Sequence, residues 1–96
     1  MIIRVFRACV QPGANAAYER LIHEAAVPLM KQQQGLLALH VGRGYPVSPD
    51  EYVMVSVWND MAAIQAFTGE HWQQAVVLPG EAHLVKETSV QHFEAL

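Results

Sequence analysis

The sequence has 96 residues, of which 52% are hydrophobic, and this length predicts one domain over residues 1–96. The formal net charge is −3 and the six basic residues are spread along the chain, so nucleic acid and anionic membranes are poor candidate partners. With one cysteine, Cys9, the chain has no internal disulfide framework, which favours a reducing compartment, and we expect a cytoplasmic protein.

The N-terminal segment IIRVFRACV, residues 2–10, is rich in β-branched and apolar side chains and predicts a first strand. A turn follows at residues 11–13, QPG. Arg4 and Arg7 interrupt the apolar run, so it is neither a signal-peptide core nor a membrane span. Alternation places Arg4 with Phe6 on one face of the strand, and Arg7 with Cys9 on the other.

Between residues 14 and 34 the apolar side chains recur at spacings of three and four, which predicts a helix. Pro28 lies inside this run, so we expect a kink or a restart there, and Gly35 ends the helix. Residues 36–45 and 51–58 predict a second and a third strand around a loop with two prolines. The third strand, EYVMVSVW, is not strongly polar on either face, so we expect both its faces to be covered.

Asn59 and Asp60 cap a second predicted helix over residues 61–68, which Gly69 ends. Residues 70–77 are compatible with one or two further helical turns, and residues 88–96 with a last strand. The order β-α-β-β-α-β predicts an α+β, ferredoxin-like fold with a four-stranded antiparallel sheet and two helices on one face. Because the other sheet face needs a cover, we expect a homodimer in which two sheets pack face to face as a dimeric α/β barrel.

Several segments carry a resemblance to a known family: VSVWNDMAAIQAF, the later HWQQAVVLP, the final VQHFEAL, and PLMKQQQGLLAL at the end of the first helix. The chain resembles the antibiotic biosynthesis monooxygenase domain over nearly its whole length. The resemblance implies a dimeric α/β barrel and, for some members, a cofactor-independent monooxygenase that oxidises aromatic phenols or quinols with molecular oxygen. Other members of the family cleave haem.

The haem-cleaving members use an asparagine on the first strand, a tryptophan three residues after the phenylalanine of the second helix, and a later histidine. Here the first strand has no asparagine, and Glu70 stands three residues after Phe67. Only His83 offers a loosely placed histidine. The haem-cleaving activity is therefore the less favoured of the two.

His71 and Trp72 follow Gly69 and form one candidate for the site. Trp72 would stack on a flat aromatic substrate and His71 would take a phenolic proton as general base, and Phe67 and Tyr52 complete the predicted substrate-binding set. Adjacent helical residues point about 100° apart, so Trp72 and His71 are not expected to face one pocket together. The alternative is that Trp72 packs in the core and His71 is solvated.

His40, His92 and Arg43 form the predicted catalytic set. His40 and His92 are histidines within apolar strands, and either would accept a phenolic proton near neutral pH. Arg43 would bind a ligand anion or an enolate. The structural alternative for the two histidines is a hydrogen-bonded residue in the dimer barrel or at a sheet edge. For Arg43 it is an ion pair with a carboxylate at an interface, such as Asp50 or Glu94.

The five histidines and the single cysteine lack metal-ligand spacing, so we expect neither a metal nor another cofactor. The leading hypothesis is an enzyme that lets an aromatic anion react with oxygen. The alternatives are a non-catalytic module that binds a small hydrophobic ligand, and a structural module whose dimer surface is the function.

Overall fold

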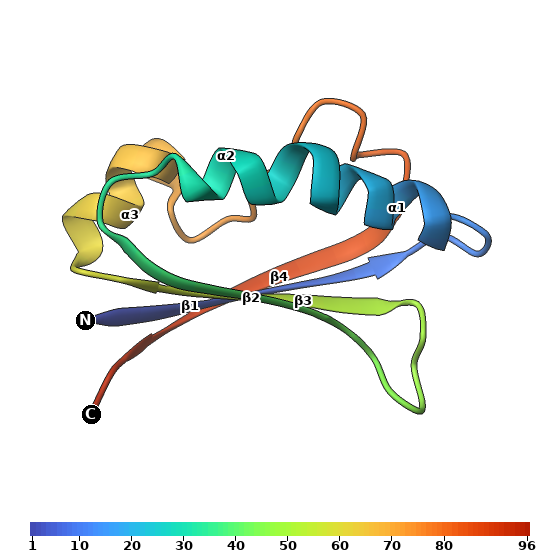
Figure 1. The fold of residues 1–96 in the computed structure, drawn as a ribbon, viewed down its shortest axis with the longest axis horizontal. Coiled ribbons are helices and arrows are strands. Elements are labelled where there is room, and N and C mark those ends of the chain that lie inside the picture. The colour runs from blue at the N-terminus through green and yellow to red at the C-terminus, as the bar shows by residue number, and fades with distance from the viewer.

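The computed structural model describes all residues, 1–96. Its elements in chain order are β1 (Ile2–Val10), α1 (Asn15–Leu21), the π-helical turn η1 (Ile22–Ala26), α2 (Val27–Lys31), β2 (Leu36–Arg43), β3 (Glu51–Trp58), α3 (Met61–Thr68), the 3₁₀ turn η2 (Gly69–His71) and β4 (Val85–Glu94). The four strands form one antiparallel sheet in the order β2-β3-β1-β4. The helices form one layer on one face of this sheet (Figure 1). The predicted α+β, ferredoxin-like fold is confirmed.

Strand alternation decides which side chains meet the helices. On β1 the even-numbered residues from Arg4 to Val10 face the helix layer, where Arg4, Ala8 and Val10 are buried. Their partners on β3 include Tyr52 and Ser56, which are buried on the same face. The odd-numbered residues of both strands lie on the other face of the sheet. Figure 1 shows that no helix covers this face. The predicted first and third strands have the observed bounds.

The first helical segment changes its winding before Pro28. The amide of Val27 donates to the carbonyl of Ile22, five residues back, at the end of the π turn. Proline has no N–H to donate, and its ring clashes with the carbonyl four residues earlier, so a wider turn relieves the contact. The helix resumes as α2 with Pro28 in its first turn. The predicted restart at this proline is confirmed.

Gly35 joins the helix layer to β2 at a point where a side chain has no space. Its φ of +86° lies in the left-handed region, and a Cβ built on it would lie 2.6 Å from the Cβ of Ala63. Only glycine fits such a conformation and such a close approach to α3. At the other side of α3, Asp60 accepts a hydrogen bond from the amide of Ala63, which confirms the predicted helix cap.

Two buried clusters hold the helices on the sheet. One contains Trp58, Ile64 and Met30 and lies where α3 crosses the end of β3. The other joins β1, β3 and the first helical segment around Tyr18. Trp58 is fully buried, stacks on Phe67 with ring centroids 5.7 Å apart, and donates from Nε1 to Ser56 Oγ at 2.9 Å. These contacts fix the floor of the space between the sheet and the helices.

The C-terminal third differs most from the sequence prediction. The predicted helical turns over residues 70–77 reduce to η2, and the chain then runs without regular structure to residue 84. β4 begins at Val85 rather than at residue 88, and it pairs with β1 through a bulge near Cys9 and Val10. The second strand ends at Arg43, two residues before the predicted end.

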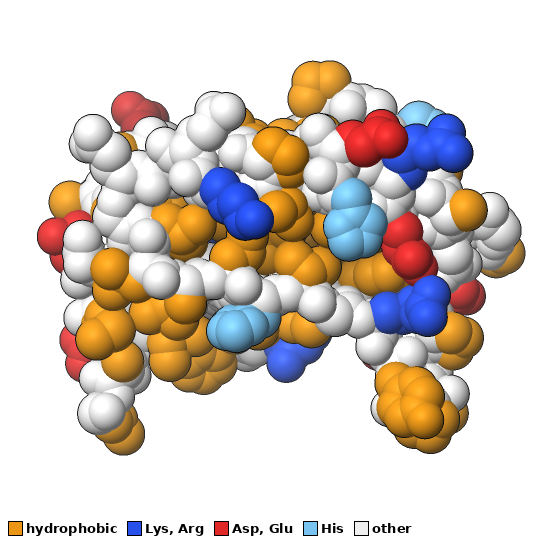
Figure 2. All heavy atoms as spheres, in the orientation of Figure 1, with side chains coloured by type: hydrophobic (Ala, Val, Ile, Leu, Met, Phe, Trp, Pro, Cys, Tyr) orange, Lys and Arg blue, Asp and Glu red, His pale blue; other side chains and the backbone are white.

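The face opposite the helices stays open in the single chain. It carries valines from β3, among them Val55, together with Val5 and the half-exposed Phe93. The connection between β2 and β3 projects below this face, and Figure 2 shows hydrophobic side chains on that projection. Tyr45 and Val47 belong to it and are 93% and 75% exposed. No helix of the structure has the length and apolar character that a membrane crossing requires.

Candidate functional site

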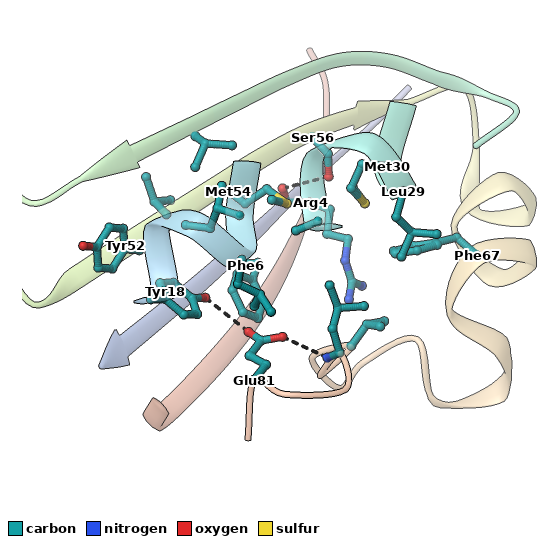
Figure 3. A pocket seen from close by; sticks show the side chains of 17 residues that line it. Arg4, Phe6, Tyr18, Leu29, Met30, Tyr52, Met54, Ser56, Phe67 and Glu81 are labelled. Atoms are coloured by element: carbon teal, nitrogen blue, oxygen red, sulfur yellow. Dashed lines mark hydrogen bonds between the residues drawn. The ribbon is translucent and has the colours of Figure 1, made fainter. Parts of the chain in front are cut away.

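A pocket lies between the sheet and the helix layer (Figure 3). Seventeen residues line it, and fourteen of them are hydrophobic. They come from β1, β3, the first helical segment, α3 and the irregular segment 72–84, and Val41 adds the edge strand β2. Hydrophobic side chains are visible between the helix layer and the sheet in Figure 2. The cavity volume is about 60 Å³.

Arg4 is the one cationic side chain on this pocket wall, and it is 4% exposed. Its Nη1 donates to the backbone carbonyl of Trp72 at 2.7 Å, and its Nη2 donates to the carbonyl of Gln74 at 3.2 Å. Its side chain therefore reaches from β1 toward the segment that closes the pocket (Figure 3). Burial lowers the pKa of Arg4 from its usual value, because the charged form loses hydration.

His92 of β4 lies beside the same guanidinium, with Nε2 2.8 Å from Nη1 of Arg4. Arginine can only donate, so Nε2 of His92 accepts and the ring is neutral. Burial, followed by the positive charge of Arg4, lowers the pKa of His92 below its usual value of 6.5. The Trp72 ring packs edge-on against His92, with centroids 5.1 Å apart. Trp72 and His92 therefore pack against each other, with His92 next to the Arg4 guanidinium.

Tyr18 and Glu81 form the second polar group of the pocket wall. The Tyr18 hydroxyl donates to Oε2 of Glu81 at 3.2 Å, and Oε1 of Glu81 accepts from the amide of Leu78 at 2.9 Å (Figure 3). Burial, and then the charge of Glu81, raise the pKa of Tyr18. Glu81 is 4% exposed, so it anchors the irregular segment from inside the pocket.

Tyr52 lies at the end of the pocket opposite Phe67 (Figure 3). Its ring lies 5.0 Å from that of Tyr18, and its hydroxyl donates to Oε2 of Glu19 at 2.6 Å. The same oxygen accepts from Nη1 of Arg43 at 2.8 Å. The hydrogen bond from Tyr52, and then that from Arg43, lower the pKa of Glu19. The Tyr52 hydroxyl is thereby held away from the apolar interior.

The structure brings part of the predicted site together. Phe67 and Tyr52, two of the residues predicted to bind the substrate, line the pocket. His92 and Trp72 stand beside Arg4, outside the lining itself. His71 is exposed, which agrees with the prediction that Trp72 and His71 do not face one pocket together.

Two predicted catalytic residues lie away from the pocket. His40 pairs with Val55 in the sheet and is exposed on the uncovered face, because the alternation of β2 turns it from the helices. Arg43 is on the helix side at the exposed end of β2, in an ion pair with Glu19. Within the single chain Arg43 therefore pairs with Glu19 and not with Asp50 or Glu94.

Sequence reasoning missed Arg4, Tyr18 and Glu81 as site residues. A signal for Arg4 was present, because a charge on the same strand face as Phe6 and Val10 enters an apolar layer. Glu81 had no such signal, since it lies in a segment without periodicity. No three His, Cys, Asp or Glu side chains come together in an arrangement that could hold a metal ion.

Comparisons with known proteins agree with this geometry. Residues 1–77 match the family model described as antibiotic biosynthesis monooxygenase. A crystal structure described as antibiotic biosynthesis monooxygenase has a TM-score of 0.80 at 21% identity, covering 100% of this chain and 99% of that chain. Rv0793 from Mycobacterium tuberculosis has a TM-score of 0.76 at 14% identity, covering 99% and 94%.

A third similar structure is a mutant of MhuD with two manganese protoporphyrin IX molecules bound per active site. Its TM-score is 0.73 at 17% identity, and the match covers 100% of this chain and 95% of that chain. At these identities the three structures establish a shared fold. A comparison with curated protein sequences finds no match.

Proposed function

Since the chain belongs to the antibiotic biosynthesis monooxygenase family, we propose that it oxidises a small aromatic phenol or quinol with molecular oxygen, without a metal or flavin. The observation that supports this most is the apolar pocket around Arg4, between sheet and helices. Burial of a flat ring against mostly hydrophobic walls supplies binding energy, while the few polar groups orient it.

The size of the pocket favours a substrate with one ring. A cavity needs roughly 10–15 Å³ to hold one water molecule, so a volume of about 60 Å³ corresponds to a few waters or a small ring. Met30 and Met54 line the cavity, and their unbranched side chains can move to admit a slightly larger ligand. A fused-ring substrate would need a larger rearrangement of the helix layer.

In the proposed reaction the substrate first loses a phenolic proton, and the electron-rich anion reacts directly with oxygen. One oxygen atom enters the product as a carbonyl in place of a ring hydrogen, and the other leaves as water with that hydrogen and the phenolic one. The ring loses four electrons and O₂ gains four, so no further reductant is needed. We propose that His92, the neutral histidine beside Arg4, accepts this proton. Because its Nε2 is bonded to Nη1 of Arg4 and its ring lies outside the lining, that hydrogen bond must open before His92 can reach the substrate.

The other predicted residues receive roles from their positions. Phe67 and Tyr52 form opposite parts of the lining and would contact the ring of the substrate. Trp72 would hold His92 in place through their ring contact. His40 and Arg43 receive no role in the reaction, because neither lines the pocket nor contacts Arg4.

Oxygen uptake tests this function directly. Purified protein would be supplied with one-ring hydroquinones and with anthrones, and ¹⁸O₂ would show whether one labelled atom enters the product. Met54→Trp adds bulk inside the pocket and should abolish uptake, whereas Ala62→Trp adds the same side chain on the exposed side of α3 and should retain it. Equal activity of both variants would contradict the proposed site.

Haem cleavage and ligand binding without turnover are the alternatives. A porphyrin is far larger than the cavity, and the first strand has no asparagine, so haem cleavage is the weaker of the two. If phenols quench tryptophan fluorescence but no oxygen is consumed, the binding function replaces the enzyme. If neither occurs, the dimer surface itself becomes the favoured function.

We also propose that the chain acts as a homodimer, whose partner covers the open sheet face. Members of this family are typically dimeric, and the open face carries the apolar side chains of Val5, Val55 and Phe93. Light scattering that shows a monomer at micromolar concentration would contradict the dimer. A cytoplasmic location remains a proposal that rests on the single cysteine.

A further inference from the structure

Arg4 is a buried charge without an ionic partner. Arginine is almost never fully buried unless it is paired, and an isolated charge in an apolar interior is costly. The one salt bridge in the structure joins Arg43 to Glu19 and does not involve Arg4. All three groups bonded to Arg4 are neutral, namely the carbonyls of Trp72 and Gln74 and the ring of His92.

The guanidinium also has donor capacity to spare. Arginine has five N–H groups, and the three hydrogen bonds of Arg4 use two on Nη1 and one on Nη2. No hydrogen bond within the protein uses Nε–H or the second N–H of Nη2, and Nε keeps some solvent contact, because no fully buried side-chain nitrogen lacks a partner. These two nitrogens are neighbours on the planar group, in the fork arrangement that matches a carboxylate or another anionic oxygen.

The pocket walls around Arg4 indicate what kind of ligand fits beside its free N–H groups. Apart from Arg4, the polar groups on the wall are Ser56, Glu81 and the tyrosine hydroxyls, and each of these has a hydrogen-bond partner. Ser56 donates to the carbonyl of Arg4 itself. The remaining walls are hydrophobic, so a hydrated inorganic ion would lose its water without replacement.

We propose that the pocket binds a small organic anion, with one apolar ring against the hydrophobic walls and an anionic oxygen on the free N–H groups of Arg4. This deepens the proposed function, on which it rests for the location of the site, by assigning the charge of the bound substrate and the group that holds it. The bound anion supplies the ionic partner that Arg4 lacks, and the low-dielectric surroundings strengthen their attraction. The Glu81 carboxylate shares the pocket, so the anionic oxygen must lie at Arg4, away from Glu81. His92, kept neutral, does not compete for the anion.

Direct binding tests the charge without requiring turnover. Calorimetry or tryptophan fluorescence would compare two anions, benzoate and 2,4-dinitrophenolate, with the neutral benzamide and 2,4-dinitroanisole and with the cationic benzylamine. Both anions, or one of them, should bind at least roughly tenfold more tightly than the neutral analogue, as expected for charge-assisted hydrogen bonds. The preferred anion then identifies the substrate as a carboxylate or an ionised phenol.

Arg7 provides the matched control, because it lies on the same strand but on the opposite face and is exposed. Arg4→Gln should weaken anion binding at least roughly tenfold, whereas Arg7→Gln should leave it unchanged. If Arg4→Gln does not fold, Arg4→Lys keeps the charge but lacks the planar fork, and it should bind benzoate several-fold more weakly. Circular dichroism establishes which variants are folded.

Three results would overturn the inference. They are equal binding of neutral and anionic analogues, equal loss in Arg4→Gln and Arg7→Gln, and displacement of benzoate by inorganic phosphate at equal concentration. Oxygen uptake is scored separately. Anion binding without uptake upholds the anion site and rejects the oxygenase, whereas uptake with neutral substrates alone upholds the oxygenase and rejects the anion site.

Discussion

Arg4 and Arg7 stand three residues apart on β1, and their surroundings differ because they face opposite sides of the sheet. Arg4 points under the helices, is 4% exposed, and donates to two backbone carbonyls and His92. Arg7 is exposed on the uncovered face and donates to the side chain of Gln91 at 3.0 Å. The same side chain is thus part of a pocket wall in one case and a solvated surface group in the other.

This difference extends to the two sheet faces as a whole. The covered face is packed by the helices and encloses the pocket, so its side chains have fixed partners. The uncovered face carries partly exposed valines and the exposed His40, and no helix packs against them. A histidine or arginine in an apolar strand is therefore a candidate site residue only if it lies on the sheet face that encloses the pocket. The sequence alone does not tell which face that is.

The largest expected difference between the faces is in stability. Trp58→Ala removes a fully buried ring that stacks on Phe67, and should lower the free energy of unfolding by about 3–5 kcal/mol. Val57→Ala, one residue away on the uncovered face, should lower the free energy of unfolding by clearly less. Urea denaturation measures both. A similar loss in the two variants would contradict the assignment of the core to the covered face.

The polar anchor of the pocket should have an intermediate effect. Tyr18→Phe leaves the buried carboxylate of Glu81 with only the Leu78 amide as partner, so we expect a loss of about 1–3 kcal/mol in unfolding free energy. Tyr45→Phe serves as the control, because that side chain is 93% exposed. No loss in Tyr18→Phe would show that the hydrogen bond to Glu81 does not stabilise the fold.

The neutral state of His92 predicts a smaller, pH-dependent effect. Its pKa is lowered in the folded protein, so between that pKa and 6.5 the unfolded chain binds more protons than the folded one. Stability should therefore fall as the pH drops through 6.5 and level off below the folded pKa. Thermal denaturation from pH 7.5 to 5 measures this, and His92→Gln should reduce the slope. A steeper slope in His92→Gln would contradict the sign of the shift.

The smallest effect is expected at the exposed end of β2. Arg43→Ala breaks the ion pair with Glu19, but the Arg43 and Glu19 side chains are 58% and 36% exposed, and solvent screens such pairs. We expect no measurable change in stability or in oxygen uptake. A strong loss of uptake would restore Arg43 as a catalytic residue.

Local patterns predicted the fold well, because the signals for β1, β3 and α3 lie within each element. Strand alternation and the Asp60 cap are properties of a few neighbouring residues. The pocket depends on contacts that sequence patterns do not record. Arg4 meets the backbone carbonyl of Trp72, 68 residues away, and His92, 88 residues away. A carbonyl has no sequence signature, so the group that completes the site was not predictable.

The most direct test of the account is a crystal structure of the protein with bound benzoate or dinitrophenolate. The account predicts the ring between the sheet and the helices, in contact with Phe67, and the anionic oxygen within hydrogen-bond distance of Nε or Nη2 of Arg4. A ligand bound on the opposite face, beside His40 and between two copies, would contradict it. The chemistry would then belong to the surface that the helices leave open.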